Sequence, residues 1–130
     1  MTSAALTLEI LPDRLAVAQL PPGQRALPEW ATGGDLVALL LTPEETTIVC
    51  KENAAPPGTR QEAGWRALRV QGMLDFGLVG ILAELASRLA AAGISLYALS
   101  TFSTDYLLVK EEALSAAVQA LRQAGHQVIE

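Results

Sequence analysis

The segment Asp75-Phe76-Gly77-Leu78-Val79-Gly80 places glycines where a long apolar helix is predicted to begin. Glycine leaves backbone N–H groups accessible, and the first N–H groups of a helix carry partial positive charge. Together these features make a site for an anion such as a carboxylate. In a competing structural interpretation, Asp75 is an ordinary N-cap, and Gly77 and Gly80 allow close packing of the helix on a sheet.

A second polar segment, Ser100-Thr101-Phe102-Ser103-Thr104-Asp105-Tyr106, lies between two predicted strands. As a ligand loop it offers Asp105 to an ammonium group, Phe102 to an apolar flank, and its hydroxyls, Thr101 among them, for orientation. The alternative is a hydrophilic hairpin turn that the aspartate caps. An anion site close to a cation site suits a zwitterion, that is, an amino acid.

Few residues of the chain are suited to catalysis. It has one histidine, His126, which is interpreted as a helix-terminal or surface residue, and one cysteine, Cys50, in an apolar run typical of a small buried hydrophobe. It contains no Walker A, G-x-G-x-x-G, H-E-x-x-H or G-x-S-x-G motif. We therefore expect no catalytic residue, no metal site and no cofactor.

The composition excludes several classes of protein. A chain of 130 residues that is 51% hydrophobic is not disordered. Its net charge is −5 and its basic residues are scattered, which argues against nucleic-acid binding. The N-terminus lacks the features of a signal peptide, and the longest uncharged stretch, 89–104, is too short and polar to span a bilayer. A cytoplasmic protein without a membrane segment is expected.

The second half has the clearer secondary-structure pattern, because all seven prolines lie at or before Pro57. Its apolar periodicity predicts strands over 66–71, 94–100, 106–110 and 126–129, and helices over 78–92 and 111–124. We also expect Glu84 and Arg88 to pair on the first helix. The order β-α-β-β-α-β predicts an α+β fold, with both helices on one face of a four-stranded antiparallel sheet.

The first half is predicted to contain strands but no long helix. Residues 6–10 and 14–19 suggest a hairpin around Pro12-Asp13, and 35–41 and 46–50 suggest two further strands. A gapless offset of 59 places Gly34 on Gly93 and the strands of one half on those of the other. We interpret the chain as two copies of one βαββαβ unit, the first with its helices shortened to 27–31 and 52–55. The composition changes near 56–64.

Three stretches resemble a known family. Residues 74–83, 92–101 and 107–109 resemble ACT domains, particularly the regulatory domains of aspartate kinases. Residues 94–109 are similar to the ACT-like domains of CASTOR-type cytosolic arginine sensors and to small stand-alone bacterial ACT proteins. The resemblance implies two tandem ferredoxin-like ACT units, a degenerate N-terminal unit over 1–64 and a C-terminal ACT domain over 65–130.

The resemblance also implies an amino acid held at an interface between ACT units. Carried over to this sequence, the ligand-binding residues are Asp75, Phe76, Gly77, Gly80, Thr101, Phe102 and Asp105. The arginine sensors have acids where this chain has Gly77 and Leu78, so a guanidinium group would lose a charged partner here. Arginine is therefore not the default ligand, and a neutral or smaller amino acid is an equal candidate.

Three hypotheses of function follow from the sequence. The first is a non-enzymatic regulatory module that binds an amino acid. The second is a dimerisation or protein-interaction module without a ligand, and the third is a small enzyme on a ferredoxin-like fold, which the missing motifs place last. A C2 homodimer is expected, because the predicted strands carry apolar residues on both faces.

The Gly77→Val variant tests the first of these hypotheses. A branched side chain at Gly77 obstructs the approach of a carboxylate to the backbone, so amino-acid binding should fall while the fold survives. Calorimetric titration and a thermal melt measure the two effects. Unfolding of the variant would favour the packing interpretation, and normal binding would place the site elsewhere.

Overall fold

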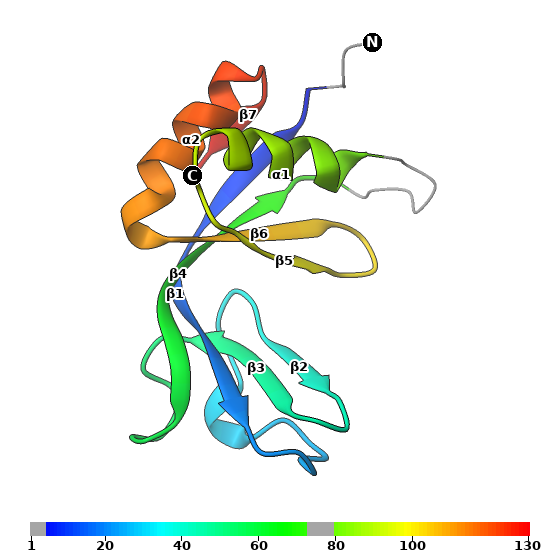
Figure 1. Cartoon of the computed structure of the whole chain (residues 1–130), viewed down its shortest axis with the longest axis vertical. Coiled ribbons are helices and arrows are strands. Elements are labelled where there is room, and N and C mark those ends of the chain that lie inside the picture. Colours follow the sequence, from blue (N-terminus) through cyan, green and yellow to red (C-terminus); the bar gives the residue numbers. More distant parts are fainter. Residues whose placement is uncertain (1–4, 73–79) are drawn as a thin grey trace. The chain divides into compact units, whose positions relative to one another are not determined.

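The computed structural model describes residues 5–72 and 80–130, and these form seven strands and two α-helices (Figure 1). The strands are β1 (Thr7–Leu20), β2 (Ala38–Leu41), β3 (Thr46–Lys51), β4 (Arg60–Val70), β5 (Tyr97–Ser100), β6 (Asp105–Lys110) and β7 (Gln127–Ile129). The helices are α1 (Ile81–Ala91) and α2 (Leu114–Gln123), with short 3-10 turns η1 (Glu29–Ala31) and η2 (Glu111–Ala113).

The chain divides into two compact units that do not follow the order of the sequence. Unit 1 comprises Met1–Leu11 and Arg66–Glu130, and unit 2 comprises Pro12–Trp65. The strand order β2-β3-β1-β4-β6-β5, with β7 also paired to β1, shows why. The long strands β1 and β4 each contribute one end to each unit. The expected division between 1–64 and 65–130 differs from these units in one respect. It assigns the first residues of β1 to the N-terminal half, whereas in the structure they lie in unit 1.

The predicted hairpin around Pro12 is wrong, because β1 is one continuous strand. Proline has no N–H to donate to a sheet, but side chains bond the backbone on both sides of it. The Leu11 carbonyl accepts a hydrogen bond from Arg66 Nη2 at 3.1 Å. The N–H of Asp13 donates to Asp35 Oδ2, and the N–H of Asp35 donates to Asp13 Oδ2, both at 2.8 Å. The strand therefore passes through the proline.

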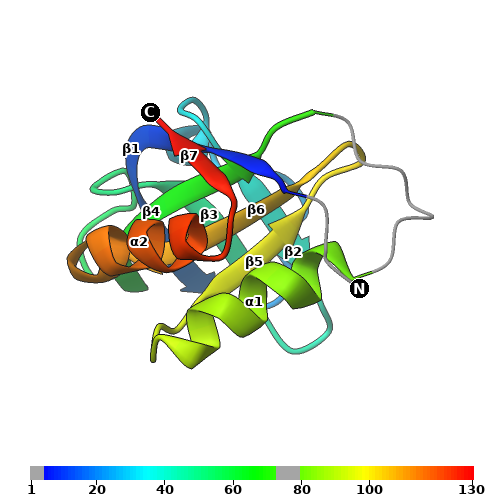
Figure 2. The same ribbon diagram turned by 90° about the horizontal axis from the view of Figure 1, so that it is seen from above.

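The predicted order β-α-β-β-α-β is confirmed in unit 1 as β4-α1-β5-β6-α2-β7. Both helices lie on one face of the sheet, as Figure 2 shows. The prediction of a four-stranded antiparallel sheet is wrong, because β1 lies between β7 and β4 and pairs in parallel with β7, Leu8 opposite Val128. A strand from the far end of the sequence thus completes the sheet.

Each helix ends in the same hydrogen-bonded turn, which a glycine closes with positive φ. After α1, Gly93 N–H donates to the Ala90 carbonyl and Ile94 N–H donates to the Leu89 carbonyl. Gly125 and His126 repeat the arrangement after α2. These are Schellman motifs, which satisfy the last carbonyls of a helix. Because Ile94 belongs to the helix end, β5 begins at Tyr97, three residues later than predicted.

The core of unit 1 lies between the helices and the sheet. Leu85 and Leu89 of α1 face the sheet at helical spacing, and Glu84 and Arg88 pair on the same helix as predicted, with Nε and Oε2 2.9 Å apart. Leu78, the predicted first residue of the helix, lies outside the described residues. The buried core comprises Leu8, Leu68, Val70, Leu85, Leu89, Ile94, Leu107, Val109, Ala117, Val118, Leu121 and Val128.

The two hairpins, β2–β3 and β5–β6, match at the predicted offset of 59. Their strand bounds coincide at this offset, and so does the register, because Ala38 faces Val49 as Tyr97 faces Leu108. The turns share their hydrogen bonds as well, since Thr42 N–H donates to the Glu45 carbonyl at 3.0 Å as the equivalent bond in the later hairpin does at 2.9 Å. Similar residues at one spacing therefore form similar local structure.

Unit 2 has a small core and contains no α-helix. Ala18, Ala31, Ile48 and Cys50 form it, with partly buried side chains such as Trp30 around them. The predicted short helix near 27–31 is the 3-10 turn η1. Residues 52–55 form a turn instead of a helix, and Asn53 has a φ of 70° in it. Asparagine tolerates this left-handed conformation better than most residues.

An arginine–glutamate pair occurs in each of the two units. Arg14 Nε lies 2.7 Å from Glu52 Oε2, and Arg66 Nη1 lies 3.0 Å from Glu111 Oε2. The two glutamates are 59 positions apart, and each follows the third strand of its predicted unit. The hydrogen bond from Arg14 lowers the pKa of the Glu52 carboxyl below its usual 4.5, helped by the charge of Arg14 and the backbone of Gly64, and opposed by burial.

The Glu52→Gln variant should reduce stability at neutral pH by about 0.5 kcal/mol, a small effect because Arg14 is half exposed. A carboxyl whose pKa is lowered by folding stabilises the protein above its unfolded-state pKa, and this stabilisation is lost as pH falls through the folded pKa. Urea unfolding at neutral pH and well below pH 4.5 should show a difference only at neutral pH. Arg14→Gln should have the same effect, and a difference that persists in acid would contradict the ion-pair explanation.

Candidate ligand-binding site

The turn between β5 and β6 is closed by its two threonines. Thr101 N–H donates to the Thr104 carbonyl at 2.9 Å, and the Thr101 hydroxyl lies 3.3 Å from both the carbonyl oxygen and the backbone nitrogen of Thr104. Such side-chain bonds to the backbone favour tight turns. The turn thus has a defined shape and holds three of the predicted ligand residues, Thr101, Phe102 and Asp105.

Asp105 begins β6 directly opposite Ser100, the last residue of β5. The Ser100 hydroxyl donates to Asp105 Oδ1 at 2.6 Å, and the aspartate is partly exposed. The bond to the serine places the carboxylate at the end of the hairpin without neutralising it. The sequence singled out Asp105 but not this partner.

Thr104 is buried beside Asp105, with only 8% of its surface exposed. Its hydroxyl donates to the carbonyl of Val70, the last residue of β4, at 2.6 Å. The turn is thereby tied to the end of β4. Sequence analysis gave Thr104 no role of its own, because nothing in a local pattern shows which backbone carbonyl a threonine will meet 34 positions away.

Gly80 is the N-cap of α1 and has a φ of 86°. Its carbonyl accepts the N–H of Glu84 at 2.8 Å, and among the described residues no side chain caps the start of the helix. The N-cap position that the structural interpretation gave to Asp75 is therefore occupied by Gly80. Asp75, Phe76 and Gly77 lie outside the described residues, so their predicted roles stay predictions.

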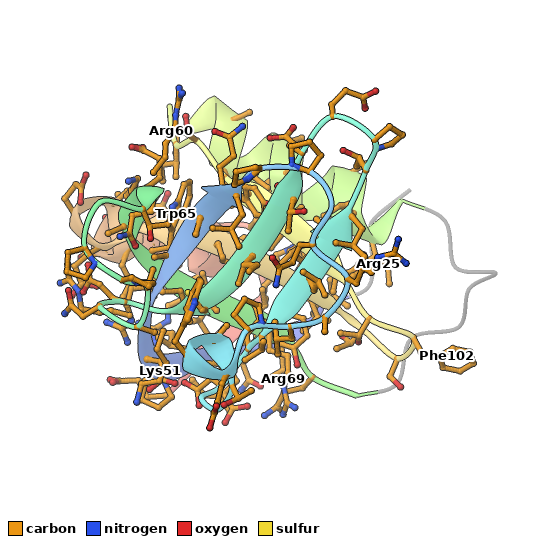
Figure 3. All side chains as sticks on the ribbon, turned by 90° about the horizontal axis from the view of Figure 1, so that it is seen from below. Arg25, Lys51, Arg60, Trp65, Arg69 and Phe102 are labelled. Atoms are coloured by element: carbon orange, nitrogen blue, oxygen red, sulfur yellow. The ribbon has the colours of Figure 1, made fainter. Side chains whose placement is uncertain are left out.

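Phe102 lies at the tip of the β5–β6 turn and is 79% exposed (Figure 3). An aromatic side chain with this exposure has most of its apolar surface in contact with water. The expected apolar flank for a ligand is thus on the surface of unit 1. A molecule or partner that covers Phe102 would remove this surface from water.

His126 is buried, with 2% of its side chain exposed, and the prediction that it follows a helix is confirmed. Its Nδ1 accepts the N–H of Leu6 at 3.1 Å, so Nε2 carries the proton and donates to Glu84 Oε2 at 3.1 Å. Hydrogen bonds from Arg88, chiefly, and from His126 lower the pKa of the Glu84 carboxyl. Both ring nitrogens are thus used within the fold.

The cysteine is buried in the fold as well. Cys50 is buried, and burial raises the pKa of its thiol, which disfavours the reactive thiolate. In the described parts of the chain no group of three or more histidine, cysteine, aspartate or glutamate residues is placed to hold a metal ion. No described helix is long and apolar enough to cross a membrane.

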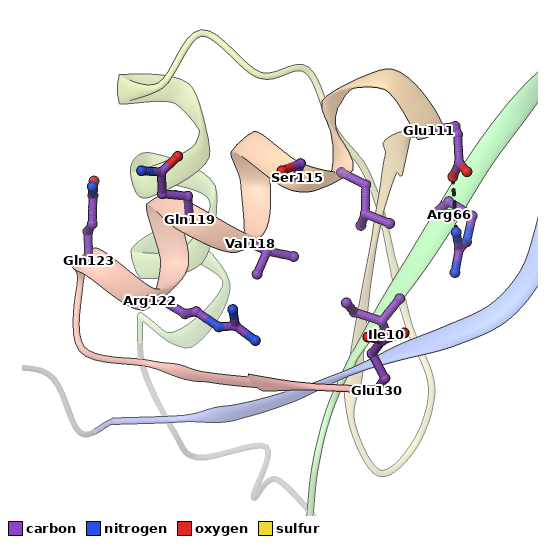
Figure 4. Close-up of a pocket in the computed structure, with 10 residues that line it drawn as sticks. Ile10, Arg66, Glu111, Ser115, Val118, Gln119, Arg122, Gln123 and Glu130 are labelled. Atoms are coloured by element: carbon purple, nitrogen blue, oxygen red, sulfur yellow. Dashed lines mark hydrogen bonds and ion pairs between the residues drawn. The ribbon is translucent and has the colours of Figure 1, made fainter.

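A groove of about 820 Å³ lies beside α2 in unit 1 (Figure 4). Its lining combines apolar side chains with the Arg66–Glu111 pair and with Arg122, whose Nη2 donates to the Val128 carbonyl at 2.7 Å. The described residues that line it are Ile10, Arg66, Glu111, Leu114, Ser115, Val118, Gln119, Arg122, Gln123 and Glu130. Of the predicted ligand residues that the structure describes, Gly80, Thr101, Phe102 and Asp105, none lines this groove.

Comparison with known proteins gives a family for this fold. The model of the ACT domain matches residues 60–123. The crystal structure of a protein from Agrobacterium tumefaciens is 33% identical, with a TM-score of 0.90 and coverage of 98% of this chain and 96% of that one. The chain belongs to the ACT domain family.

Two further relatives have descriptive names. The human cytosolic arginine sensor for mTORC1 subunit 1 is 44% identical over 64 residues, which are 47% of this chain and 20% of that protein. The chain therefore corresponds to a small part of that sensor. The structure of the regulatory subunit of aspartate kinase from Thermus thermophilus, in its ligand-free form, matches with a TM-score of 0.64 and 15% identity. The match covers 95% of this chain and 99% of that subunit, and it shows a similar fold.

The Asp105→Asn variant tests the role of the hairpin acid. The amide keeps the shape and an acceptor for Ser100 but removes the charge, and a charge-assisted bond contributes about 1.5–3 kcal/mol against about 1 for a neutral one. The affinity for an amino acid should fall about tenfold, while the melting temperature of the free protein barely changes.

Calorimetric titration and a thermal melt of Asp105→Asn measure the two effects. Ser100→Ala is the matched control, because it removes the partner of the carboxylate and keeps its charge. It should weaken binding less than Asp105→Asn. An Asp105→Asn protein that is less stable and binds normally would show that the acid only caps the turn.

Proposed function

We propose that this protein is a non-enzymatic regulatory module that senses an amino acid, bound where ACT units associate. One observation carries the proposal: the ACT match over 60–123 contains every predicted ligand residue. The human relative, with 44% identity, is named an arginine sensor. The protein acts in the cytoplasm in this proposal, without nucleic acid, membrane or cofactor.

The described residues offer both charges that an amino acid needs. The Asp105 carboxylate, held at the end of the hairpin by Ser100, suits the ammonium group. The start of α1 suits the carboxylate, because Gly80 has no side chain and no described side chain caps the helix. Thr101 and Phe102 contribute a hydroxyl and an apolar flank. Since Gly77 and Leu78 replace the acids of the arginine sensors, a neutral or smaller amino acid fits as well as arginine.

We extend the proposal to the architecture of the chain, as a degenerate ACT-like unit over 1–64 followed by an ACT domain over 65–130. The equal bounds, register and turn bonds of the two hairpins support this duplication. The pairs Arg14–Glu52 and Arg66–Glu111 add a further likeness, because their glutamates are 59 positions apart and each arginine lies on the first strand of its proposed unit.

The same protein is proposed to be a homodimer. β2 lies at one end of the strand order and has no charged residue, and its Leu40 and Leu41 are 46% and 51% exposed. Natural edge strands usually carry charges or proline that prevent pairing with another chain. A second copy that pairs with β2 would satisfy its backbone and cover both leucines.

A screen of the twenty amino acids by thermal shift tests the sensor proposal. A ligand that binds only the folded state raises stability by RT ln(1 + [L]/Kd), so at about 100 times Kd the gain is about 2.7 kcal/mol. We expect at least one amino acid to raise the melting temperature, and Asp105→Asn to remove the shift. If none does, the alternative of a dimerisation module without a ligand is the better account.

Analytical ultracentrifugation tests whether the protein is a dimer and whether the dimer forms through β2. A dimer that dissociates on Leu41→Lys, with an unchanged melting profile of the monomer, would support pairing through β2. A monodisperse monomer at tens of micromolar, an order-of-magnitude choice set by typical transient affinities, would contradict the homodimer.

A further inference from the structure

Thr104 is the one buried hydroxyl in the described part of unit 1 that joins the β5–β6 turn to another strand. Its side chain donates to the Val70 carbonyl at 2.6 Å, and its backbone closes the turn with Thr101. It immediately precedes Asp105. This bond therefore adds to the pairing of β4 with β6 in fixing the aspartate relative to the end of β4.

The end of β4 is held from a second direction. Gln71, the residue after Val70, donates its N–H to the Thr7 carbonyl at 2.8 Å. The chain thus leaves β4 at a defined point. The first turn of α1 is held separately, because Glu84 accepts a hydrogen bond from the buried His126.

Resting on the function proposed above, we infer that Thr104 is a positioning residue for the ligand site. Its hydroxyl bond fastens the turn that holds Thr101, Phe102 and Asp105 to the end of β4. The hydroxyl of Thr101 and the carboxylate of Asp105, which the proposal gives to the ligand, are thereby held in one geometry. A preorganised pair of groups binds more tightly than a mobile pair, because less freedom is lost on binding.

The equivalent junction of unit 2 supports this reasoning and provides a control. Glu45 stands 59 positions before Thr104, and its Oε1 accepts a hydrogen bond from Gln19 Nε2 near the end of β1 at 2.9 Å. That bond is exposed, whereas the Thr104 bond is buried. A tie between the turn and the first strand thus exists in both units, and in unit 1 it is short and shielded from water.

The test compares Thr104→Val, which replaces the hydroxyl with a methyl group, with Thr104→Ser, which keeps the hydroxyl. Glu45→Ala removes the hydrogen bond between Gln19 and Glu45 in unit 2. Val118→Ala destabilises the core of unit 1 at a position outside the β5–β6 turn. Each variant is titrated with every amino acid that stabilises the parent protein in the screen. Amide hydrogen exchange of Gln71 is measured without any amino acid.

We expect Thr104→Val to weaken amino-acid binding about tenfold and to speed exchange of the Gln71 N–H about tenfold, the size of effect that one lost buried bond produces. Thr104→Ser should stay within about twofold of the parent in both measurements. Glu45→Ala and Val118→Ala should leave the affinity unchanged, although Val118→Ala lowers the melting temperature.

The two readouts separate failure of this inference from failure of the proposed function. If no amino acid binds the parent protein, the sensor proposal fails and the positioning role falls with it, even where exchange at Gln71 shows that the bond exists. If amino acids bind and Thr104→Val retains full affinity, the positioning role is wrong while the sensor proposal survives. Equal loss of affinity in Val118→Ala would also overturn it, since general destabilisation would then explain the effect.

Discussion

β1 runs without a break from Thr7 to Leu20, although Pro12 lies inside it and can donate no backbone hydrogen bond. The strand survives because Arg66 bonds the carbonyl before the proline and Asp35 bonds the N–H after it. Its first residues pair with β7 and its last residues pair with β3. Both units therefore depend on the same strand, and the seven-stranded sheet could not form as it does if the chain turned at the proline.

The two hairpins show how one backbone design serves two chemistries. Ser100 and Asp105 face each other at the end of the β5–β6 hairpin, and the matching residues of the β2–β3 hairpin are Leu41 and Thr46. Thr46 is fully buried, and its hydroxyl has no hydrogen-bond partner in the described structure, whereas Asp105 is partly exposed. The polar end suits a small charged ligand, and the apolar end with its exposed leucines suits another protein surface.

The buried polar groups of unit 1 act as ties between segments that are distant in sequence. Thr104 bonds the end of β4, and His126 bonds both Leu6, the residue before β1, and the first turn of α1. A buried donor or acceptor without a partner costs about 1–3 kcal/mol, so each tie favours one arrangement of the segments over its alternatives. The proposed ligand site would be held in place by these bonds.

Elements that depend on near neighbours followed from the sequence. Apolar spacing predicted α1, α2 and the two hairpins, and the offset of 59 predicted the match between hairpins, because periodicity and turn residues act within a few positions. Within the candidate site, the polar turn with Thr101, Phe102 and Asp105 was predicted for the same reason. The pairing of Glu84 with Arg88 was also predicted, since four residues make one turn of helix.

Features that depend on distant partners became visible only in the folded molecule. The sequence around Pro12 is typical of a turn, whereas in the structure the hydrogen bonds from Arg66 and to Asp35 hold it in a strand. Nothing near His126 in the sequence indicates that Leu6 and Glu84 will surround it, and nothing near Thr104 indicates Val70. Local patterns report the conformation of a segment, whereas the partner of a buried polar group is chosen by the packing of the whole unit.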